Sequence, residues 1–348
     1  MSKTAENRLS AFAGSGFWVG RFGAGSLIAV LLLLVVEAWL HSDSFLYQYR
    51  SVFAAGRAMD KVIYVEKERP DLLIAGNSRI DNGIDPKILM ENSSVFAAPF
   101  NLGVPGINMR ALYGIFKRFA DKDIFSSGGV NAVLIGLDET MFQSVDMLGY
   151  SVVFGNREKL LVYGEWKELL ASWIRLWGYS DSLKGLREPA KLERFIKATC
   201  SVVEPVGGAA SEYHGYRANY GSKFQNAEQV RMQMAGTKEP PDPTEVAYLW
   251  NLLDLLEDQN ISVAIVFPPL LNRNVLFLSP EEPEAGPYIK IMDQLRDRGL
   301  PIIALGLEDK KYPYEFSNPG HLNDIGAKKY TKVLSAMLRQ VWVTHSGM

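Results

Sequence analysis

The chain has 348 residues, of which 47% are hydrophobic and 22% charged, and its formal net charge is −2. A chain of this length can form one large domain with a smaller addition, and this apolar fraction excludes a disordered protein. The near-neutral charge gives no electrostatic reason to expect a nucleic-acid partner. The single cysteine, Cys200, excludes an intramolecular disulfide, a structural zinc cluster and a CxxC redox site. The four histidines lack ligand spacing, so we expect neither a metal nor a cofactor.

The most apolar stretch of the chain lies near its N-terminus. Residues 22–40 are nineteen residues with one charge, Glu37. A helix of that length spans about 28 Å, close to the hydrocarbon thickness of a bilayer. Trp18 and Trp39 stand near its two ends, where amphipathic rings favour a membrane interface. The pattern predicts one transmembrane helix.

The charges beside this stretch predict its orientation. Basic residues precede it, and acidic residues lie at its far end. The positive-inside rule then places residues 1–21 in the cytoplasm and the chain after residue 40 outside it. A cleaved signal peptide and a buried core helix are the alternatives. The stretch is long for a signal peptide and has no small-residue cleavage site after Leu40, and it lacks the polar face of a core helix.

Beyond the anchor, the chain alternates short apolar runs with helical patterns, which is typical of a parallel sheet covered on both faces. Residues 41–70 show no strong pattern and are predicted to be a stalk. We expect one three-layer α/β/α domain over 71–343, with a five-stranded parallel sheet of the flavodoxin-like, doubly wound kind. The predicted strands are 72–75, 95–102, 132–137, 262–267 and 301–305, and the predicted helices are 85–91, 109–120, 245–259, 287–297 and 328–341.

About a hundred residues, 138–242, separate the third and fourth predicted strands, which is far beyond an ordinary crossover. Inside this insertion, residues 158–177 carry a stripe of apolar side chains at helical spacing. We expect the stripe to pack on the domain, and a lid or a docking surface is the alternative. The stripe consists of Leu161, Trp166, Leu169, Leu170, Trp173 and Trp177.

A serine follows the first predicted strand, in the run Gly76-Asn77-Ser78-Arg79. A turn at this point can present the serine Oγ at the top of the sheet, with the serine's own N–H aimed at a developing oxyanion. Serine is also a favoured helix cap after any such turn. The motif therefore fits a nucleophile or a cap.

Two further motifs lie at the same edge of the predicted sheet. The second strand leads into Asn101-Leu102-Gly103-Val104-Pro105-Gly106, where a glycine N–H can serve an oxyanion or a glycine can merely allow a tight loop. His321 precedes the last helix. It can act as a general base toward Ser78, or it can be a surface loop residue.

Together these motifs resemble the SGNH (GDSL-like) hydrolase superfamily, over roughly residues 70–343. The resemblance implies that Ser78 is the nucleophile, Gly106 the oxyanion glycine and His321 the base. With its anchor, the chain is most similar to membrane-tethered members such as the alginate acetylation proteins and the D-alanylation protein of teichoic acids. That similarity implies the bacterial inner membrane, a periplasmic domain, an acyl donor, a cell-envelope polysaccharide and a multi-span membrane-bound O-acyltransferase as partner.

Two positions depart from the family pattern. Asn318 stands where the family has an aspartate three residues before the histidine, and Glu315 or Asp309 could replace that aspartate if the loop folds back. Asp138 stands where the third strand normally offers an asparagine to the oxyanion. A carboxylate there would repel an oxyanion unless it points elsewhere, and it could instead orient Arg79 or bind a sugar hydroxyl.

These observations leave two hypotheses. The first is an extracytoplasmic serine O-acyltransferase or esterase that acts on a polysaccharide, with Arg79, Asn101 and Asp138 as substrate-binding residues and the transferase preferred by family analogy. The second is a catalytically degenerate domain that binds glycan or docks onto a membrane partner. A nucleotide-binding domain is disfavoured, because the chain has neither a G-x-G-x-x-G run at the first strand nor a phosphate-binding loop motif.

Overall fold

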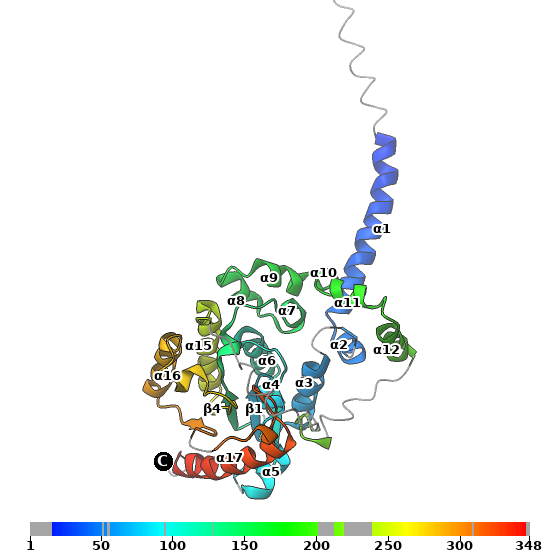
Figure 1. Ribbon diagram of the computed structural model, residues 1–348. Helices are drawn as coiled ribbons and strands as arrows, with labels where there is room; N and C mark the ends of the chain where they lie inside the picture. The colour runs from blue at the N-terminus through cyan, green and yellow to red at the C-terminus, as the bar shows by residue number, and fades with distance from the viewer. Residues whose placement is uncertain are drawn as a thin grey trace, which may run out of the picture.

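The structure is a computed structural model that describes residues 16–50, 52–53, 56–93, 95–126, 128–200, 212–218, 239–307 and 310–345, with side chains between residues 23 and 342. Its centre is a five-stranded, all-parallel sheet in the order β2-β1-β3-β4-β5 (Figure 1). This order is the flavodoxin-like arrangement. The predicted α/β class and the five-stranded parallel sheet are therefore confirmed.

The strands agree closely with the predicted ones. They are β1 (Leu72–Gly76), β2 (Pro99–Gly103), β3 (Ala132–Gly136), β4 (Ser262–Phe267) and β5 (Ile302–Ala304). The second strand begins four residues later than predicted. The backbone just before β2 does not pair with a neighbouring strand at Ala97 and Ala98, because the N–H groups of these two residues donate to the Asp71 carboxylate.

Helices cover both faces of the sheet, since its strands are apolar on both sides. Leu73 and Val133 face one buried cluster, and their neighbours Leu72 and Ala132 face the other. The first face is covered by α3 (Gly56–Glu68), α6 (Met109–Asp121), α15 (Pro243–Asp258) and α16 (Gly286–Asp297). The second face is covered by α5 (Pro86–Asn92) and α17 (Asp324–His345), and α17 begins four residues before its predicted start.

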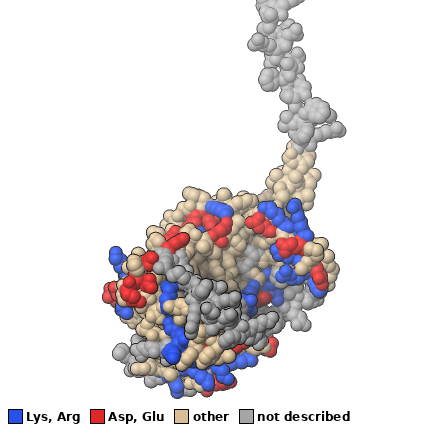
Figure 2. Space-filling view, in the orientation of Figure 1, with Lys and Arg blue, Asp and Glu red and all other residues tan. Residues whose placement is uncertain are grey.

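One helix of the described chain, α1 (Gly16–Leu40), is long and apolar enough to cross a membrane. It begins six residues before the predicted span and projects away from the domain (Figure 1, Figure 2). Residues 23–36 are exposed, whereas Leu40 is buried where the helix joins the domain. The membrane, the compartment and the orientation of the span stay predictions.

The predicted stalk over 41–70 is wrong, because this segment is part of the core. It forms α2 (Asp43–Tyr49) and α3. Phe45 is 2% exposed, and its ring packs against Tyr49 and Tyr179. The apolar residues of α3 recur at helical spacing, so that Met59 and Val62 turn into the core while Lys67 and Glu68 at its end are exposed.

The insertion is a layer of short helices: α7 (Leu148–Phe154), α8 (Arg157–Val162), α9 (Trp166–Trp173), α10 (Arg175–Gly178), α11 (Ser180–Gly185) and α12 (Pro189–Cys200). Two 3-10 turns, η2 (Glu139–Phe142) and η3 (Leu276–Leu278), lie near the sheet's carboxyl edge. Residues 201–211 and 219–238 of the insertion lie outside the described residues.

The expectation that the apolar stripe of 158–177 packs on the domain is wrong. Of its six side chains only Leu169 is buried, and Trp166 is 61% exposed. The helix breaks at Ile174, which changes the helical phase between α9 and α10. The side of α9 that packs inward carries Leu169 with the small residues Ala171 and Ser172, so the large side chains point outward.

We predict that Phe45→Ala lowers the free energy of unfolding by about 3 kcal/mol, because it empties a buried aromatic site. Denaturant unfolding of the full chain in detergent micelles measures this loss. The control is Ser44→Ala, at an exposed position of the same helix, with an expected change below about 0.5 kcal/mol. Equal stability of the two variants would restore the stalk interpretation.

Candidate active site

The candidate site lies at the carboxyl edge of the sheet, where the chain turns from β1 into α4 (Ser78–Asp81). Gly76 ends β1 with φ +153°, and a Cβ there would come within 2.8 Å of the Gly136 carbonyl oxygen. Glycine is therefore required for the turn that presents Ser78. The strands that flank β1 are β2 and β3, so the turn sits at the point where the strand order reverses, the usual ligand position in such sheets.

Ser78 and His321 meet across 243 residues of chain. The Ser78 Oγ lies 2.7 Å from His321 Nε2, and both side chains are half-buried. His321 stands on β7 (His321–Leu322), which pairs antiparallel with β6 (Phe316–Asn318) just before α17. The hairpin places the imidazole over the start of α4.

The hydrogen bonds of Asn318 define the tautomer of His321. The Asn318 Oδ1 lies 2.9 Å from His321 Nδ1 and also accepts a hydrogen bond from the Gly320 N–H at 3.0 Å. Since Oδ1 can only accept, the proton of the neutral imidazole is on Nδ1. The lone pair of Nε2 then faces the Ser78 hydroxyl, which is the arrangement a general base needs.

The surroundings of His321 disfavour its charged form. Burial and, to a lesser extent, the nearby positive charge of Arg79 together lower the pKa of the imidazole to about 4, against the opposite effect of Asp138. Asn318 offers the imidazolium a dipole and not a full charge. The histidine is therefore neutral at pH 7 and ready to accept a proton, but it is a weak base.

The carboxylates proposed to replace the missing aspartate lie elsewhere or are not described. Glu315 lies in the 3-10 turn η4 (Pro313–Glu315) and is ion-paired with Lys329 at 3.1 Å. It also accepts from the Tyr312 N–H at 3.2 Å. These bonds direct its carboxylate toward α17. Asp309 lies outside the described residues.

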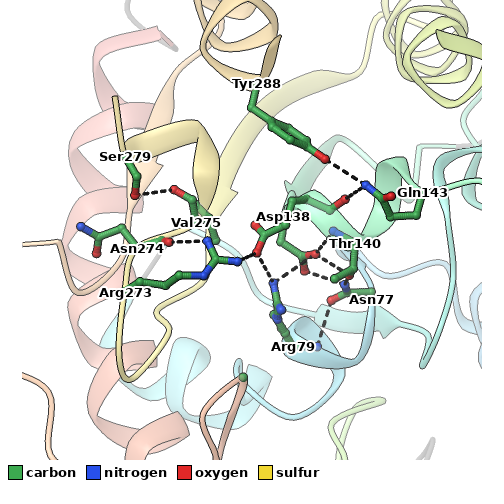
Figure 3. A network of polar contacts seen from close by, with 12 residues as sticks. Asn77, Arg79, Asp138, Thr140, Gln143, Arg273, Asn274, Val275, Ser279 and Tyr288 are labelled. Atoms are coloured by element: carbon green, nitrogen blue, oxygen red, sulfur yellow. Dashed lines mark hydrogen bonds and ion pairs between the residues drawn. The ribbon is translucent and has the colours of Figure 1, made fainter. Parts of the chain in front are cut away.

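Asp138 follows β3 and is buried, with donors on all sides (Figure 3). Its carboxylate accepts from Asn77 Nδ2 and from the Thr140 N–H, and it pairs with the Arg79 guanidinium at 3.1 Å. This geometry matches one of the two roles expected for Asp138, which is to orient Arg79. Arg79 is itself only 6% exposed, so both residues support the turn that carries Ser78 from within.

Asn101 lies on β2, and Gly106 lies in the loop that follows this strand at the carboxyl edge of the sheet. Asn101 is buried and donates to the carbonyl oxygens of Ile80 and Ile84, while its Oδ1 accepts from the Gly103 N–H. Asn101 therefore ties β2 to α4, and this geometry does not place it with groups that could contact substrate. Gly106 is exposed with φ +71°, and a Cβ at this position would meet no atom within 4 Å.

Sequence reasoning missed a buried ion pair beneath the site. Lys61 on α3 is 1% exposed, and its Nζ lies 2.7 Å from Asp81 Oδ1 and also donates to the Gly103 carbonyl oxygen. Burial lowers the pKa of Lys61 to about 8. The sequence does contain one indication of this ion pair, because Lys61 falls on the apolar face of α3, between Ala58 and Val65.

Sequence reasoning also missed the segment 212–218, which returns from the insertion to the site. The His214 carbonyl oxygen accepts from the Asn101 N–H at 2.8 Å, and the Arg217 N–H donates to the Asp81 carbonyl oxygen at 3.0 Å. The positive charge of Arg217 is close enough to contribute to the lowered pKa of His321. The segment thus brings a cationic residue to the rim of the site.

In a comparison with known proteins, neither the models of protein families nor the curated proteins contain a match to this chain.

We predict that the rate at which a fluorophosphonate labels Ser78 stays constant from about pH 8 down to about pH 6 and falls by half only near pH 4. The reason is that His321 acts in its neutral form, which persists until the pH approaches its pKa of about 4. Labelling rates of the full chain in detergent micelles at successive pH values measure this profile. An apparent pKa near 6.5 would contradict the buried environment of the histidine.

We further predict that Asn318→Asp raises both the apparent pKa of this profile and the labelling rate at neutral pH. A carboxylate at Nδ1 stabilises the imidazolium, and in the serine-protease template the reverse change lowers kcat about 10⁴-fold. Asn260→Asp, at an exposed position, is the matched control and should change neither quantity. Slower labelling of the Asn318→Asp variant would show that the amide is required at this position.

Proposed function

We propose that this chain is a serine-dependent enzyme that moves an O-acyl group, in the first place acetyl, to or from a cell-envelope or secreted polysaccharide. The observation that supports the proposal is the line of hydrogen bonds from Ser78 through His321 to Asn318, at the carboxyl edge of a parallel sheet. This geometry combines a nucleophile, a base and a residue that orients the base.

In the first half-reaction, Ser78 Oγ attacks the carbonyl carbon of the acyl donor and its proton passes to His321 Nε2. The electron pair of the broken C=O π bond moves to the carbonyl oxygen. Ser78 is the first residue of a helix, so its N–H has no intrahelical acceptor and can donate to this oxyanion. When the oxyanion collapses, the bond to the donor's leaving group breaks, and that group takes the proton from His321.

In the second half-reaction, the acceptor hydroxyl gives its proton to His321 and attacks the Ser78 ester. The acceptor is a sugar hydroxyl in a transferase and water in an esterase. Ser78 leaves with the proton held by the imidazole, so the site returns to its starting state. The family resemblance favours the transferase and assigns Gly106 as a second N–H donor.

The apolar helix α1 supports the location that we propose for this reaction. As a single-pass anchor in a bacterial inner membrane, it would hold the domain on the periplasmic side, close to a membrane-bound acyl donor. Such tethering raises the effective concentration of enzyme and donor without any new contact. A multi-span O-acyltransferase that delivers the acyl group is the partner we propose.

Asn318 favours a second candidate function. An amide at Nδ1 cannot stabilise the imidazolium with a full charge, and the cost in the protease template is about 10⁴ in kcat. The alternative is therefore a degenerate domain of the same fold that binds glycan or docks onto a partner in a membrane complex. It predicts a folded protein with an unreactive Ser78.

We predict that a fluorophosphonate forms one covalent adduct with the full chain in detergent micelles, and that the adduct disappears in Ser78→Ala. An activated serine is needed for this reaction, since ordinary surface hydroxyls stay protonated and unreactive. Intact mass measures the adduct. Ser126→Ala, an exposed serine far along the chain, should label like the natural chain.

The outcome distinguishes the two candidate functions. Labelling at Ser78 supports the enzyme and directs the search to donor and acceptor. A folded chain that fails to label both alone and with the membrane fraction present contradicts the enzyme and favours the degenerate domain.

A further inference from the structure

Most of the exposed side chains of residues 161–177, on the insertion, are large and apolar. Seven large hydrophobic residues there are each at least 42% exposed, and Lys167 is the one charged residue among the exposed positions of this described segment. Soluble monomers rarely expose apolar side chains in such a group. We name this surface the tryptophan face, and it consists of Leu161, Val162, Trp166, Leu170, Trp173, Ile174 and Trp177.

Hydrogen bonds fasten this surface to the last turn of α1. The Glu37 carboxylate accepts from the backbone N–H groups of Arg175 and Leu176, at the start of α10. The Arg175 guanidinium donates to the Leu40 carbonyl oxygen at 2.9 Å, and His41 Nε2 donates to the Trp173 carbonyl oxygen at 3.2 Å. The end of the apolar helix and the tryptophan face therefore form one unit.

These bonds also define the height of the tryptophan face along α1. Glu37 lies three residues before Leu40, where α1 enters the domain, which is about 5 Å at the rise of a helix. Figure 1 shows α8, α9 and α10 on the side of the domain from which α1 emerges, with α9 crosswise to α1. If α1 spans a bilayer, the tryptophan face lies at the level where hydrocarbon meets the headgroups.

The side chains of the tryptophan face are of the kind found at the boundary between hydrocarbon and headgroups. Tryptophan is enriched at membrane interfaces because its large ring is apolar while its indole N–H stays polar. The tryptophan face holds three of the seven tryptophans of the chain.

We propose that the tryptophan face is a second membrane contact, buried in the headgroup region of the same bilayer that α1 crosses. The occupant of this surface is lipid, because the face continues directly from the apolar helix and carries the residues of an interfacial helix. This inference rests on the proposed anchoring by α1 and is independent of the proposed catalysis. With two contacts, the domain has a defined height and tilt over the membrane, which a single helix alone does not impose.

The test uses the full chain in vesicles of phosphatidylcholine and phosphatidylglycerol, with Cys200→Ser as background. A bimane fluorophore is placed in turn at Leu170→Cys in the tryptophan face, at Val30→Cys within α1 and at Met337→Cys on α17. All three native side chains are exposed, so the substitutions spare the core. Lipids that carry a doxyl quencher near the headgroup or deeper in the acyl chain report contact with the bilayer.

We expect the shallow doxyl lipid to remove roughly half of the emission at position 170, the deep one to quench position 30, and neither to affect position 337. Quenching at position 30 without quenching at position 170 would overturn the second contact and leave the anchor intact. Absence of quenching at both positions would overturn the anchor and this inference with it. Protection of position 170 from a soluble quencher in native membranes, without doxyl quenching, would assign the face to a protein partner and likewise overturn the lipid assignment.

Discussion

The position of Ser78 depends on the buried contact of Lys61 with Asp81 and the Gly103 carbonyl oxygen. Asp81 ends α4, the short helix that Ser78 begins, so this contact holds α4 against the carboxyl ends of β1 and β2. A buried ion pair contributes little net stability, because desolvation offsets the Coulomb attraction, but breaking it leaves a charge unpaired. Its contribution here is geometric: it joins α3, α4, β2 and, through the Arg217 N–H, the segment 212–218.

Charge around the site is arranged to orient residues and not to stabilise an imidazolium directly. Asp138, the first of two carboxylates that follow β3, is neutralised by Arg79 and accepts from Asn77 Nδ2 and the Thr140 N–H. The group that touches His321 Nδ1 is the neutral amide of Asn318. The imidazole consequently has the correct tautomer but a low pKa. Such a site can attack an activated acyl donor more readily than a stable ester, because a weak base assists a good electrophile best.

The insertion between β3 and β4 contributes at two places. Its α8–α10 part forms the tryptophan face beside α1, and its segment 212–218 packs on β2 and α4 at the site. In this chain the insertion therefore supplies both the proposed membrane contact and part of the rim of the site.

Periodicity along the chain was enough to predict the sheet, most helix positions and the apolar span, because it is a local property. The pairing of Ser78 with His321 was expected only from the resemblance to the SGNH superfamily, since each motif alone also fits a cap or a loop residue. Which faces are covered, by contrast, follows from how the elements pack in three dimensions. The segment 41–70 joins the core, and the stripe with Trp166 and Trp173 points outward, since burial depends on which surface packs opposite. The contact between Lys61 and Asp81 also depends on tertiary packing. So does the finding that Asn318, and not Glu315, contacts His321 Nδ1. These contacts join residues that local pattern cannot relate, and their geometry follows from packing alone.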